Sequence, residues 1–364
     1  MNGNELDDLI AIVEKICSTH HDRRHGDGHL LDRSSWQALE ESGFTLVSVP
    51  EDAGGPGGTM QQAAAVLRAA GRVGLAAPLA ETMWLAGWLL ASSGVPVPRG
   101  PLTAAVAEPG EVNIVEVNEG WQIDGVVRRV PWAGAADTVV MLVRRRSDLL
   151  VVRLHPSEIS LRPGRNLAGE WREDVVCRKV VLDRDRVTTA GPDVSARGFL
   201  NRATLSRVLA MSGAAEEVLS VAMRHADERE QFGRPLAKFQ AVQHLIAQLA
   251  GETASVVVAG QAATLALEQE SGPQATFAIA AAKASASESA GRIAAWGHQI
   301  LGAMGFTTEH ALHRSTSRLW AWRDEFGNER HHRLSIGHQA LSTDPWNLIV
   351  GQENGRAEAD QGVS

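Results

Sequence analysis

The sequence has few of the residues that build disulfide frameworks, metal centres or nucleic-acid surfaces. Cys17 and Cys177 are the only cysteines among its 364 residues, and they are far apart and lack the spacing of a metal site. The net charge is -8 and the one dense basic run is residues 144–146, so no nucleic-acid partner is expected. The most apolar stretch, residues 83–90, is too short to span a membrane, and the acidic start does not resemble a secretory signal. These absences predict a cytoplasmic protein with no membrane partner.

Hydrophobic periodicity divides the chain into three regions. Up to about residue 93 the apolar residues recur at helical spacing, as in Leu9, Ile12 and Val13. Short β-branched runs broken by Gly, Pro and Asp follow, for example residues 138–143, and they fit a compact β-barrel or sandwich. Long helical stripes then return, and residues 275–296 form an alanine-rich helix suited to close packing. The order predicts an α+β fold with an N-terminal helical domain (1–100), a small β domain (101–190), a C-terminal helical bundle (191–350) and a flexible tail (351–364).

The most informative segment is residues 229–235, Arg-Glu-Gln-Phe-Gly-Arg-Pro. We expect one helix to end at Arg229 and a second to begin at Gln240, which brings an arginine and a glutamine close together. A guanidinium can hold phosphate oxygens bidentately and an amide can satisfy the polar edges of a nucleotide. Taken alone, the segment is equally consistent with a solvated corner between two helices.

Two further segments have glycine-rich turns. Residues 299–310 begin Gln-Ile-Leu-Gly-Ala-Met-Gly-Phe, and small residues there would let backbone amides approach a pyrophosphate. A helix starting near Thr308 would add its N-terminal dipole. Residues 49–58 form a Pro- and Gly-rich turn between N-terminal helices.

Together, in this order, the three segments resemble those of the acyl-CoA dehydrogenase family. The resemblance covers nearly the whole chain and implies that family's fold, with a central β-barrel and a C-terminal four-helix bundle. It also implies FAD as cofactor, an acyl-CoA substrate and a separate electron-transfer acceptor. The family's Gln-x-x-Gly-Gly segment has Ala303 where its second glycine would stand. The cofactor contacts carried over are Arg229, Gln231, Phe232, Gln240, Gln299, Gly302 and Ala303.

The family's chemistry requires a carboxylate that removes the α-proton of the thioester. The resemblance implies two alternative positions for this base, and they correspond to Phe326 and Ala203, neither of which can accept a proton. Glu325 is one residue from the first position and is our candidate base, since a general base is judged first by its reach. Alternatively, Asp324 and Glu325 form a solvated helix end paired with Arg323 or Arg330. The histidines at 331 and 332 are expected on a charged helix face, because no third metal ligand has a matching spacing.

The β region also departs from the family pattern, at residues that would contact the flavin ring. Residues 107–113, Ala-Glu-Pro-Gly-Glu-Val-Asn, lack the hydroxyls and second glycine that the family uses near the flavin ring. Trp132 could replace a tryptophan that flanks the ring, or could be an ordinary core or surface aromatic. The segments that hold the ADP half of FAD are therefore better preserved than those that contact the ring and carry the base.

In this family the flavin lies between subunits, and one chain reaches across to hold the ADP half of its neighbour's cofactor. The chain resembles the subunits of actinobacterial acyl-CoA dehydrogenases for steroid side chains, which are α2β2 heterotetramers. We therefore predict a subunit of a heteromeric enzyme for a bulky acyl-CoA, with steroid-derived acyl groups as candidates. The alternatives are a self-sufficient homotetramer with Glu325 as base, flavin monooxygenase chemistry, or a non-catalytic assembly subunit. Arg229, Gln240 and Gln299 argue against the last, because a scaffold needs no phosphate and amide ligands.

Overall fold

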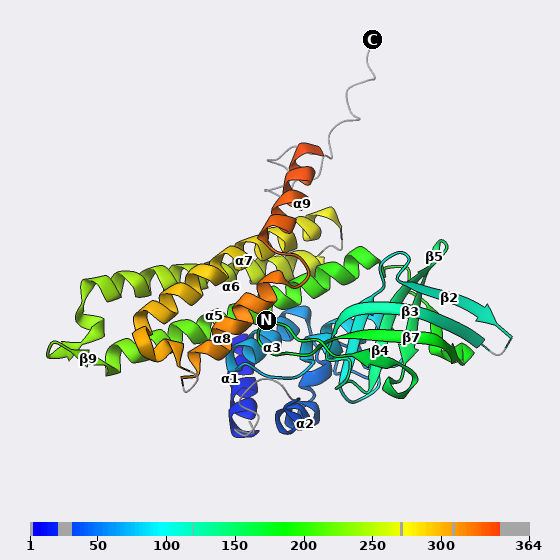
Figure 1. Cartoon of the computed structure of the whole chain (residues 1–364), viewed down its shortest axis with the longest axis horizontal. Helices are drawn as coiled ribbons and strands as arrows, with labels where there is room; N and C mark the ends of the chain where they lie inside the picture. The colour runs from blue at the N-terminus through cyan, green and yellow to red at the C-terminus, as the bar shows by residue number, and fades with distance from the viewer. Residues whose placement is uncertain (1–2, 21–30, 119, 270–271, 308–309, 343–364) are drawn as a thin grey trace, which may run out of the picture.

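The computed structural model describes residues 3–20, 31–118, 120–269, 272–307 and 310–342. Within these ranges the molecule is elongated: a helical bundle forms one end, the β domain forms the other, and the N-terminal helices lie beneath the centre (Figure 1). The predicted tail at 351–364, and the end of the predicted bundle beyond residue 342, lie outside the described residues. Among the described residues, no helix is both long and apolar enough to cross a membrane.

The N-terminal region is helical, as its periodicity predicts. The helix over Met60–Val73 begins with a capping box between Thr59 and Gln62 and ends at Gly74, whose φ is 66°. In the preceding turn, a Cβ on Gly55 would lie 2.1 Å from the carbonyl oxygen of Val49, so only glycine fits there. The helices are α1 (Gly3–His20), α2 (Arg33–Glu41), η2 (Phe44–Leu46), η3 (Glu51–Ala53), α3 (Met60–Val73), the π-helix η4 (Ala80–Ala86) and α4 (Gly87–Ser92).

The β domain consists of two four-stranded sheets. One sheet has the order β1-β4-β5-β8 and the other β2-β3-β7-β6, and β1 pairs with β4 in parallel while the other pairs are antiparallel. Buried residues of both sheets, such as Ile123 and Met141, share a second hydrophobic core. The strands are β1 (Leu102–Val106), β2 (Val112–Val117), β3 (Gly120–Pro131), β4 (Thr138–Arg145), β5 (Asp148–Leu154), β6 (Ser160–Arg162), β7 (Arg172–Leu182) and β8 (Val187–Thr189), with the short helices η5 (Pro156–Glu158) and η6 (Arg184–Arg186) between them.

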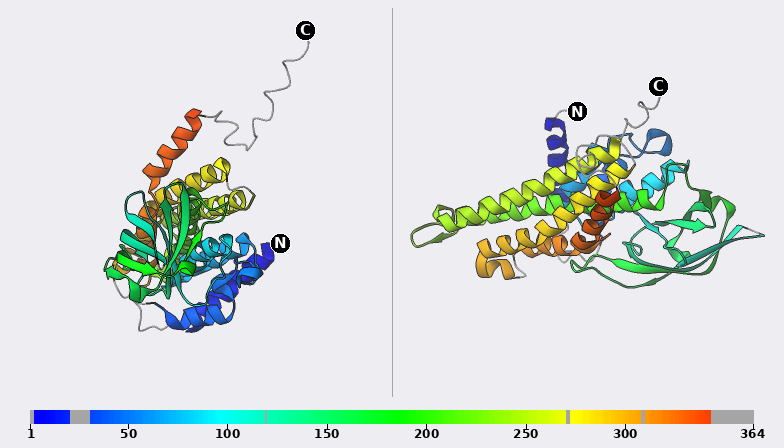
Figure 2. Two further views of the ribbon diagram at one scale, coloured as in Figure 1. Left: turned by 90° about the vertical axis from the view of Figure 1, so that its right-hand side faces the viewer. Right: turned by 90° about the horizontal axis from the view of Figure 1, so that it is seen from above.

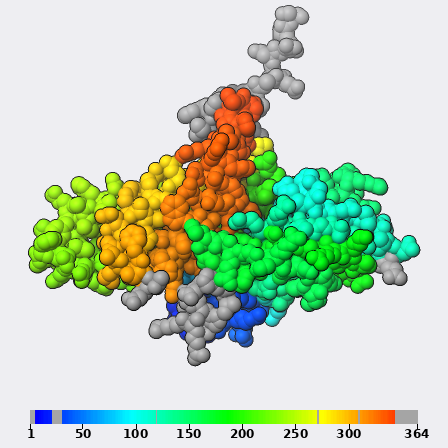
Figure 3. Space-filling model, in the orientation of Figure 1, coloured from blue at the N-terminus to red at the C-terminus, as the bar shows by residue number. Residues whose placement is uncertain are grey.

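The C-terminal bundle is organised around α5, which packs against α3, α6, α7 and α8. The crossing with α3 is very close, because a Cβ on Gly213 would lie 1.9 Å from the carbonyl oxygen of Arg68. α5 and α6 run together to a small hairpin at the far end of the molecule, and α9 projects from the body (Figures 1 and 3). The elements are α5 (Ala196–Glu228), β9 (Glu230–Gln231), β10 (Arg234–Pro235), η7 (Leu236–Lys238), α6 (Gln240–Gln269), α7 (Pro273–Leu301), η8 (Gly302–Phe306), α8 (Leu312–Asp324) and α9 (Glu329–Ser342). The predicted order of helices, small β domain and helical bundle is confirmed.

Candidate active site and flavin-binding end

The hairpin between α5 and α6 presents the first set of predicted cofactor residues. Its backbone is fixed, since the N–H of Arg229 donates to the carbonyl of His225 at 2.9 Å and the carbonyl of Arg229 accepts from Leu236 at 2.8 Å. The side chains of Arg229, Gln231 and Gln240 are exposed. Phe232 is 92% exposed and has a left-handed backbone, with φ 53°. The chain therefore fixes this corner while leaving its polar and aromatic side chains open to another molecule.

The second set of predicted residues lies where α7 ends and η8 begins. Gln299, Gly302 and Ala303 are all exposed, and Gly302 has a φ of 59°. This turn and the hairpin lie toward the same end of the bundle (Figures 1 and 2). Burial lowers the pKa of His225 on α5, and the nearby charges of His310 and Arg229 lower it further. The end of α5 is therefore close enough to His310, which follows η8, for their charges to interact. The helix expected near Thr308 begins at Leu312, and residue 308 itself lies outside the described ranges.

Glu325, the candidate base, is held by ion pairs. Its carboxylate accepts from Nε of Arg172 at 2.8 Å, from Nε of Arg207 at 2.6 Å and from Nδ2 of Asn166 at 2.9 Å. Its side chain is only 8% exposed. Of the two acidic residues expected to pair with Arg323, Asp324 lies 4.0 Å from its Nε, whereas Glu325 does not pair with it. Arg323 also pairs with Glu329 at 2.8 Å.

These ion pairs belong to a larger buried group. Arg207 also donates to Glu81 of η4 at 2.7 Å. Glu170 accepts from Arg318 at 3.3 Å and from the indole of Trp322 at 2.9 Å, and it pairs with Arg172 at 3.0 Å. We call this group the buried ion-pair cluster: Glu81, Glu170, Glu325, Arg172, Arg207 and Arg318. It balances three carboxylates with three guanidiniums and joins the N-terminal helices, the β domain and the bundle.

The electrostatics of the cluster keep Glu325 and Glu170 ionised. Burial alone would raise the pKa of Glu325, but the charges and hydrogen bonds of Arg172 and Arg207 outweigh it and hold that pKa well below its usual range. The pKa of Glu170 is lowered in the same way, because Arg172 and Arg318 overcome the effect of burial. A carboxylate in this environment has little tendency to accept a proton.

The space around the cluster is small. A cavity of about 50 Å³ lies beside it, lined by Glu81, Arg172, Arg207 and Trp132 among others. Trp132 is 3% exposed, and Phe326 places its ring 5.3 Å from the Arg207 guanidinium. Pockets for organic ligands are roughly 300–1,000 Å³. The cavity beside Trp132 thus has room for a few water molecules.

Sequence reasoning missed the residue that shapes the turn after α8. Lys283 of α7 is fully buried, and its ammonium donates to the carbonyls of Arg323, Glu325 and Gly327 at 2.7, 2.9 and 2.6 Å. Burial lowers its pKa to about 7, partly offset by the charge of Glu325. Nothing in the local sequence distinguishes this lysine, because its acceptors are about 40 residues away along the chain.

The histidine pair after this turn differs from its predicted placement. His331 is exposed, as a charged helix face requires, but His332 is 7% exposed and its Nε2 lies 3.1 Å from the carbonyl oxygen of Phe326. Burial lowers the pKa of His332 to about 4, so its ring is neutral near pH 7. Within the described parts of the chain, no group of three or more His, Cys, Asp or Glu side chains is arranged to hold a metal ion.

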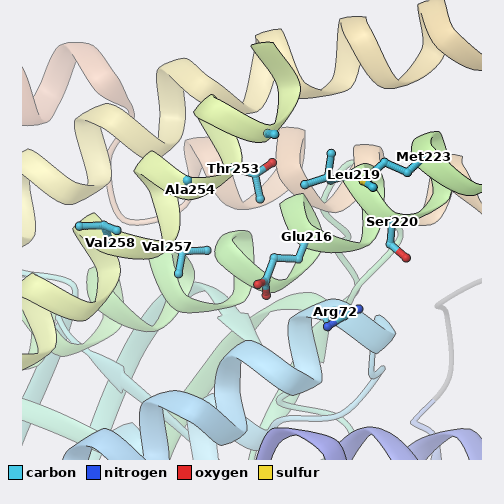
Figure 4. A pocket seen from close by; sticks show the side chains of 10 residues that line it. Arg72, Glu216, Leu219, Ser220, Met223, Thr253, Ala254, Val257 and Val258 are labelled. Carbon is cyan, nitrogen blue, oxygen red and sulfur yellow. The ribbon is translucent and has the colours of Figure 1, made fainter. Parts of the chain in front are cut away.

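Larger hollows lie elsewhere. A groove of about 540 Å³ runs between α3, α5 and α6, with Arg72 and Glu216 on one side and Leu219, Met223 and Val257 among its lining residues (Figure 4). A second hollow of about 420 Å³ adjoins it along α1 and shares Val257. Neither is lined by a residue predicted for catalysis or cofactor binding.

Comparison with known proteins identifies the family. The sequence profile described as "Acyl-CoA dehydrogenase, N-terminal domain" matches residues 6–96, and "Acyl-CoA dehydrogenase, C-terminal domain" matches residues 191–341. Acyl-CoA dehydrogenase FadE34 of Mycobacterium tuberculosis is 30% identical over 288 residues, which cover 77% of this chain and 38% of that protein.

Two solved structures have the same fold. The ChsE4–ChsE5 complex of Mycobacterium tuberculosis contains a chain with a TM-score of 0.81 and 24% identity, covering 94% of this chain and 99% of that one. A variant titled Tcur3481–Tcur3483 steroid ACAD has a TM-score of 0.81 and 22% identity, covering 93% and 98%. The family predicted from the three sequence segments is confirmed: the chain belongs to the acyl-CoA dehydrogenases, flavin-dependent CH–CH oxidoreductases whose cofactor is FAD.

Proposed function

We propose that this chain is the ADP-binding subunit of a heteromeric acyl-CoA dehydrogenase. In this proposal the α,β-dehydrogenation of the acyl-CoA takes place in the pocket of a second, related chain. That chain supplies the carboxylate base and the surroundings of the flavin ring. The bound FAD supplies the hydride acceptor. The present chain contributes phosphate and nucleotide contacts from its exposed bundle end.

The observation that carries the proposal is the buried ion-pair cluster. It contains Glu325, next to Phe326, and Arg207, four residues after Ala203 on α5, and it borders a cavity lined by Trp132. The family resemblance assigns Phe326, Ala203 and Trp132 to the base and the ring. Opening that region would separate Arg207 from Glu81 and Glu325, and buried charges without partners are costly. This supports a model in which the flavin ring and the thioester are held in the pocket of a second chain, which performs the chemistry.

The length of α5 supports the same conclusion. Arg207 of the cluster lies inside this helix and Arg229 is its C-cap, so 22 residues separate them. At 1.5 Å per residue this is about 33 Å along the helix axis. An extended FAD molecule is shorter than that distance. One flavin cannot contact Arg229 and the cluster region of the same chain.

The exposed end of the bundle fits the ADP half of FAD. Among described residues, the side chains of Arg229, Gln240 and Gln299 make no hydrogen bond or ion pair within the chain. A free guanidinium suits the phosphates, and free amides suit the polar edges of the nucleotide. Gly302 and Ala303 keep the backbone of the turn accessible, and Gln231 and Phe232 extend the same surface. These seven residues form the proposed cofactor contact.

Substrate and partners follow from the relatives as proposals. One structural neighbour is titled a steroid ACAD and another is a complex of two differently named chains. We infer a bulky, steroid-derived acyl-CoA as substrate, an α2β2 assembly with a second acyl-CoA dehydrogenase-like chain, and a separate electron-transfer protein as acceptor. A cytoplasmic location is part of the same proposal.

The test is the visible absorption spectrum of the chain purified alone and after co-expression with an acyl-CoA dehydrogenase-like chain encoded beside it. We expect flavin only in the co-expressed complex. A full complement of flavin in the lone chain would refute the proposal and favour the homotetramer. A complex that assembles without flavin would instead indicate a non-catalytic assembly subunit.

The homotetramer with Glu325 as base is favoured by one observation, since Glu325 is adjacent to Phe326 at the family position. It requires the carboxylate to leave Arg172 and Arg207 and enter a widened pocket. Turnover by the lone chain that depends on Glu325 would establish it.

A further inference from the structure

His298, on the last turn of α7, is packed beneath the turn that carries Gly302 and Ala303. Its ring stacks on Phe306 with centroids 4.7 Å apart and an interplanar angle of 25°. Its Nε2 lies 3.0 Å from the hydroxyl oxygen of Thr316 on α8. One imidazole therefore connects the end of α7, the turn η8 and the start of α8.

The turn is fitted closely to this ring. A Cβ on Gly305 would lie 3.2 Å from Nδ1 of His298 and 3.1 Å from the Cβ of Leu301. Gly305 is buried, whereas Gly302 and Ala303 are exposed on the other side of the turn. The inner side of the turn therefore rests on His298 while its outer side faces outward. A change in the ring would move the backbone that presents Gly302.

The hydrogen bonds fix the ring's orientation. Nε2 of His298 and the hydroxyl oxygen of Thr316 share a hydrogen bond, and the tautomer of the ring decides which of them donates. Nδ1 is buried beside Gly305. Burial lowers the pKa of His298, which keeps the ring neutral. The imidazole thus supplies a stacking surface and a hydrogen bond at the same time.

We propose that His298 is the positioning residue for the flavin-facing turn, and that it sets the affinity with which this chain holds the ADP half of FAD. The inference rests on the proposed function, because it requires the exposed end of the bundle to contact FAD. His298 acts through the backbone at 302–306 and does not itself touch the cofactor.

The experiment uses the complex co-expressed with its partner chain, stripped of flavin and titrated with FAD. We expect His298→Ala to raise the dissociation constant of FAD roughly tenfold or more, the scale of one lost positioning interaction. Turnover at saturating FAD should return to the wild-type value, because the reacting groups lie in the partner's pocket. Simple misfolding would not be rescued by added cofactor.

Matched variants separate the two contacts. His298→Phe retains a ring against Phe306 but loses the bond to Thr316, and Thr316→Val removes the same bond from the other side. Both should weaken FAD binding by a similar, smaller factor. His338→Ala, on the exposed surface of α9, is the control and should bind FAD as the wild type does.

Two outcomes overturn the inference, and they are distinguishable. If Arg229→Ala loses flavin while His298→Ala and His298→Phe bind FAD normally, His298 has no positioning role and the proposed function stands. If neither Arg229→Ala nor the His298 variants change FAD binding, the bundle end does not contact flavin and both proposals fail.

Discussion

Glu325 and Arg207 are 118 residues apart in the sequence, yet an oxygen of the carboxylate lies 2.6 Å from Nε of the guanidinium. The same carboxylate binds Arg172, and the same guanidinium binds Glu81. Glu325 and Arg207 therefore each have two oppositely charged partners, and neither can leave without exposing a buried charge. The pair lies beside Phe326, one of the two positions at which the family resemblance expects the base.

The substitution Glu325→Gln should reduce stability and leave the chemistry of the complex nearly unchanged. It leaves Arg172 and Arg207 with one counter-ion fewer, and breaking a buried pair costs about 3–5 kcal/mol. We expect that loss in the free energy of unfolding, measured with denaturant, and turnover per bound flavin within about threefold of wild type. Asp324→Asn, at a side chain that is 69% exposed, is the control and should change stability by less than about 0.5 kcal/mol. A fall of several orders of magnitude in turnover with unchanged stability would make Glu325 the base.

Acid should destabilise the protein through the same carboxylates. The folded-state pKa values of Glu325 and Glu170 lie below their ordinary value of 4.5, so the stabilisation is complete above that pH and is lost as the pH falls. The free energy of unfolding should therefore decline steadily below about pH 5. The decline should be shallower in Glu325→Gln, which has one fewer such group. If the free energy of unfolding fell equally with pH in the wild type and in Glu325→Gln, Arg172 and Arg207 would not be lowering the pKa of Glu325.

Arg229→Ala should lower flavin retention by the complex. Losing a charge-assisted hydrogen bond to phosphate costs about 1.5–3 kcal/mol, which corresponds to roughly a tenfold to hundredfold weaker affinity. The flavin-to-protein absorbance ratio after gel filtration reports the change. Arg197→Ala, at the other end of α5 and also exposed, should retain flavin normally. Equal flavin content in both variants would contradict the placement of the ADP half at this end.

Lys283→Met should loosen the turn after α8. The substitution keeps an unbranched apolar stem of similar size and removes the donor to three carbonyl oxygens. Leaving buried carbonyls unpaired costs about 1–3 kcal/mol each, so we expect a total loss of about 3 kcal/mol after local relaxation. Hydrogen exchange should become faster at amides of residues 324–332. Lys238→Met, at an exposed position in η7, should leave both quantities unchanged.

The sequence predicted the family and the order of the three regions because these depend on local signals. Helical spacing, β-branched runs and glycine-rich turns each indicate the structure of a few neighbouring residues. Each of the three motifs is a continuous segment, so it can be recognised from the sequence alone. The exposed positions of Arg229, Gln240 and Gln299 also follow from the hairpin and the helix end that carry them.

Only the tertiary structure decided that Glu325 is buried and ion-paired. Glu81, Arg172 and Arg207 come from a π-helix, a strand and a long helix, and no spacing in the sequence connects them. Whether a carboxylate is a base or a counter-ion depends on which charges surround it and on how far it is removed from water. Those neighbours are set by the packing of the three regions against one another, as are Lys283 under its turn and His298 under the glycine segment. The chain's sequence therefore determined its fold and its family, whereas the meeting of its three regions determined that Glu325 is paired with Arg172 and Arg207.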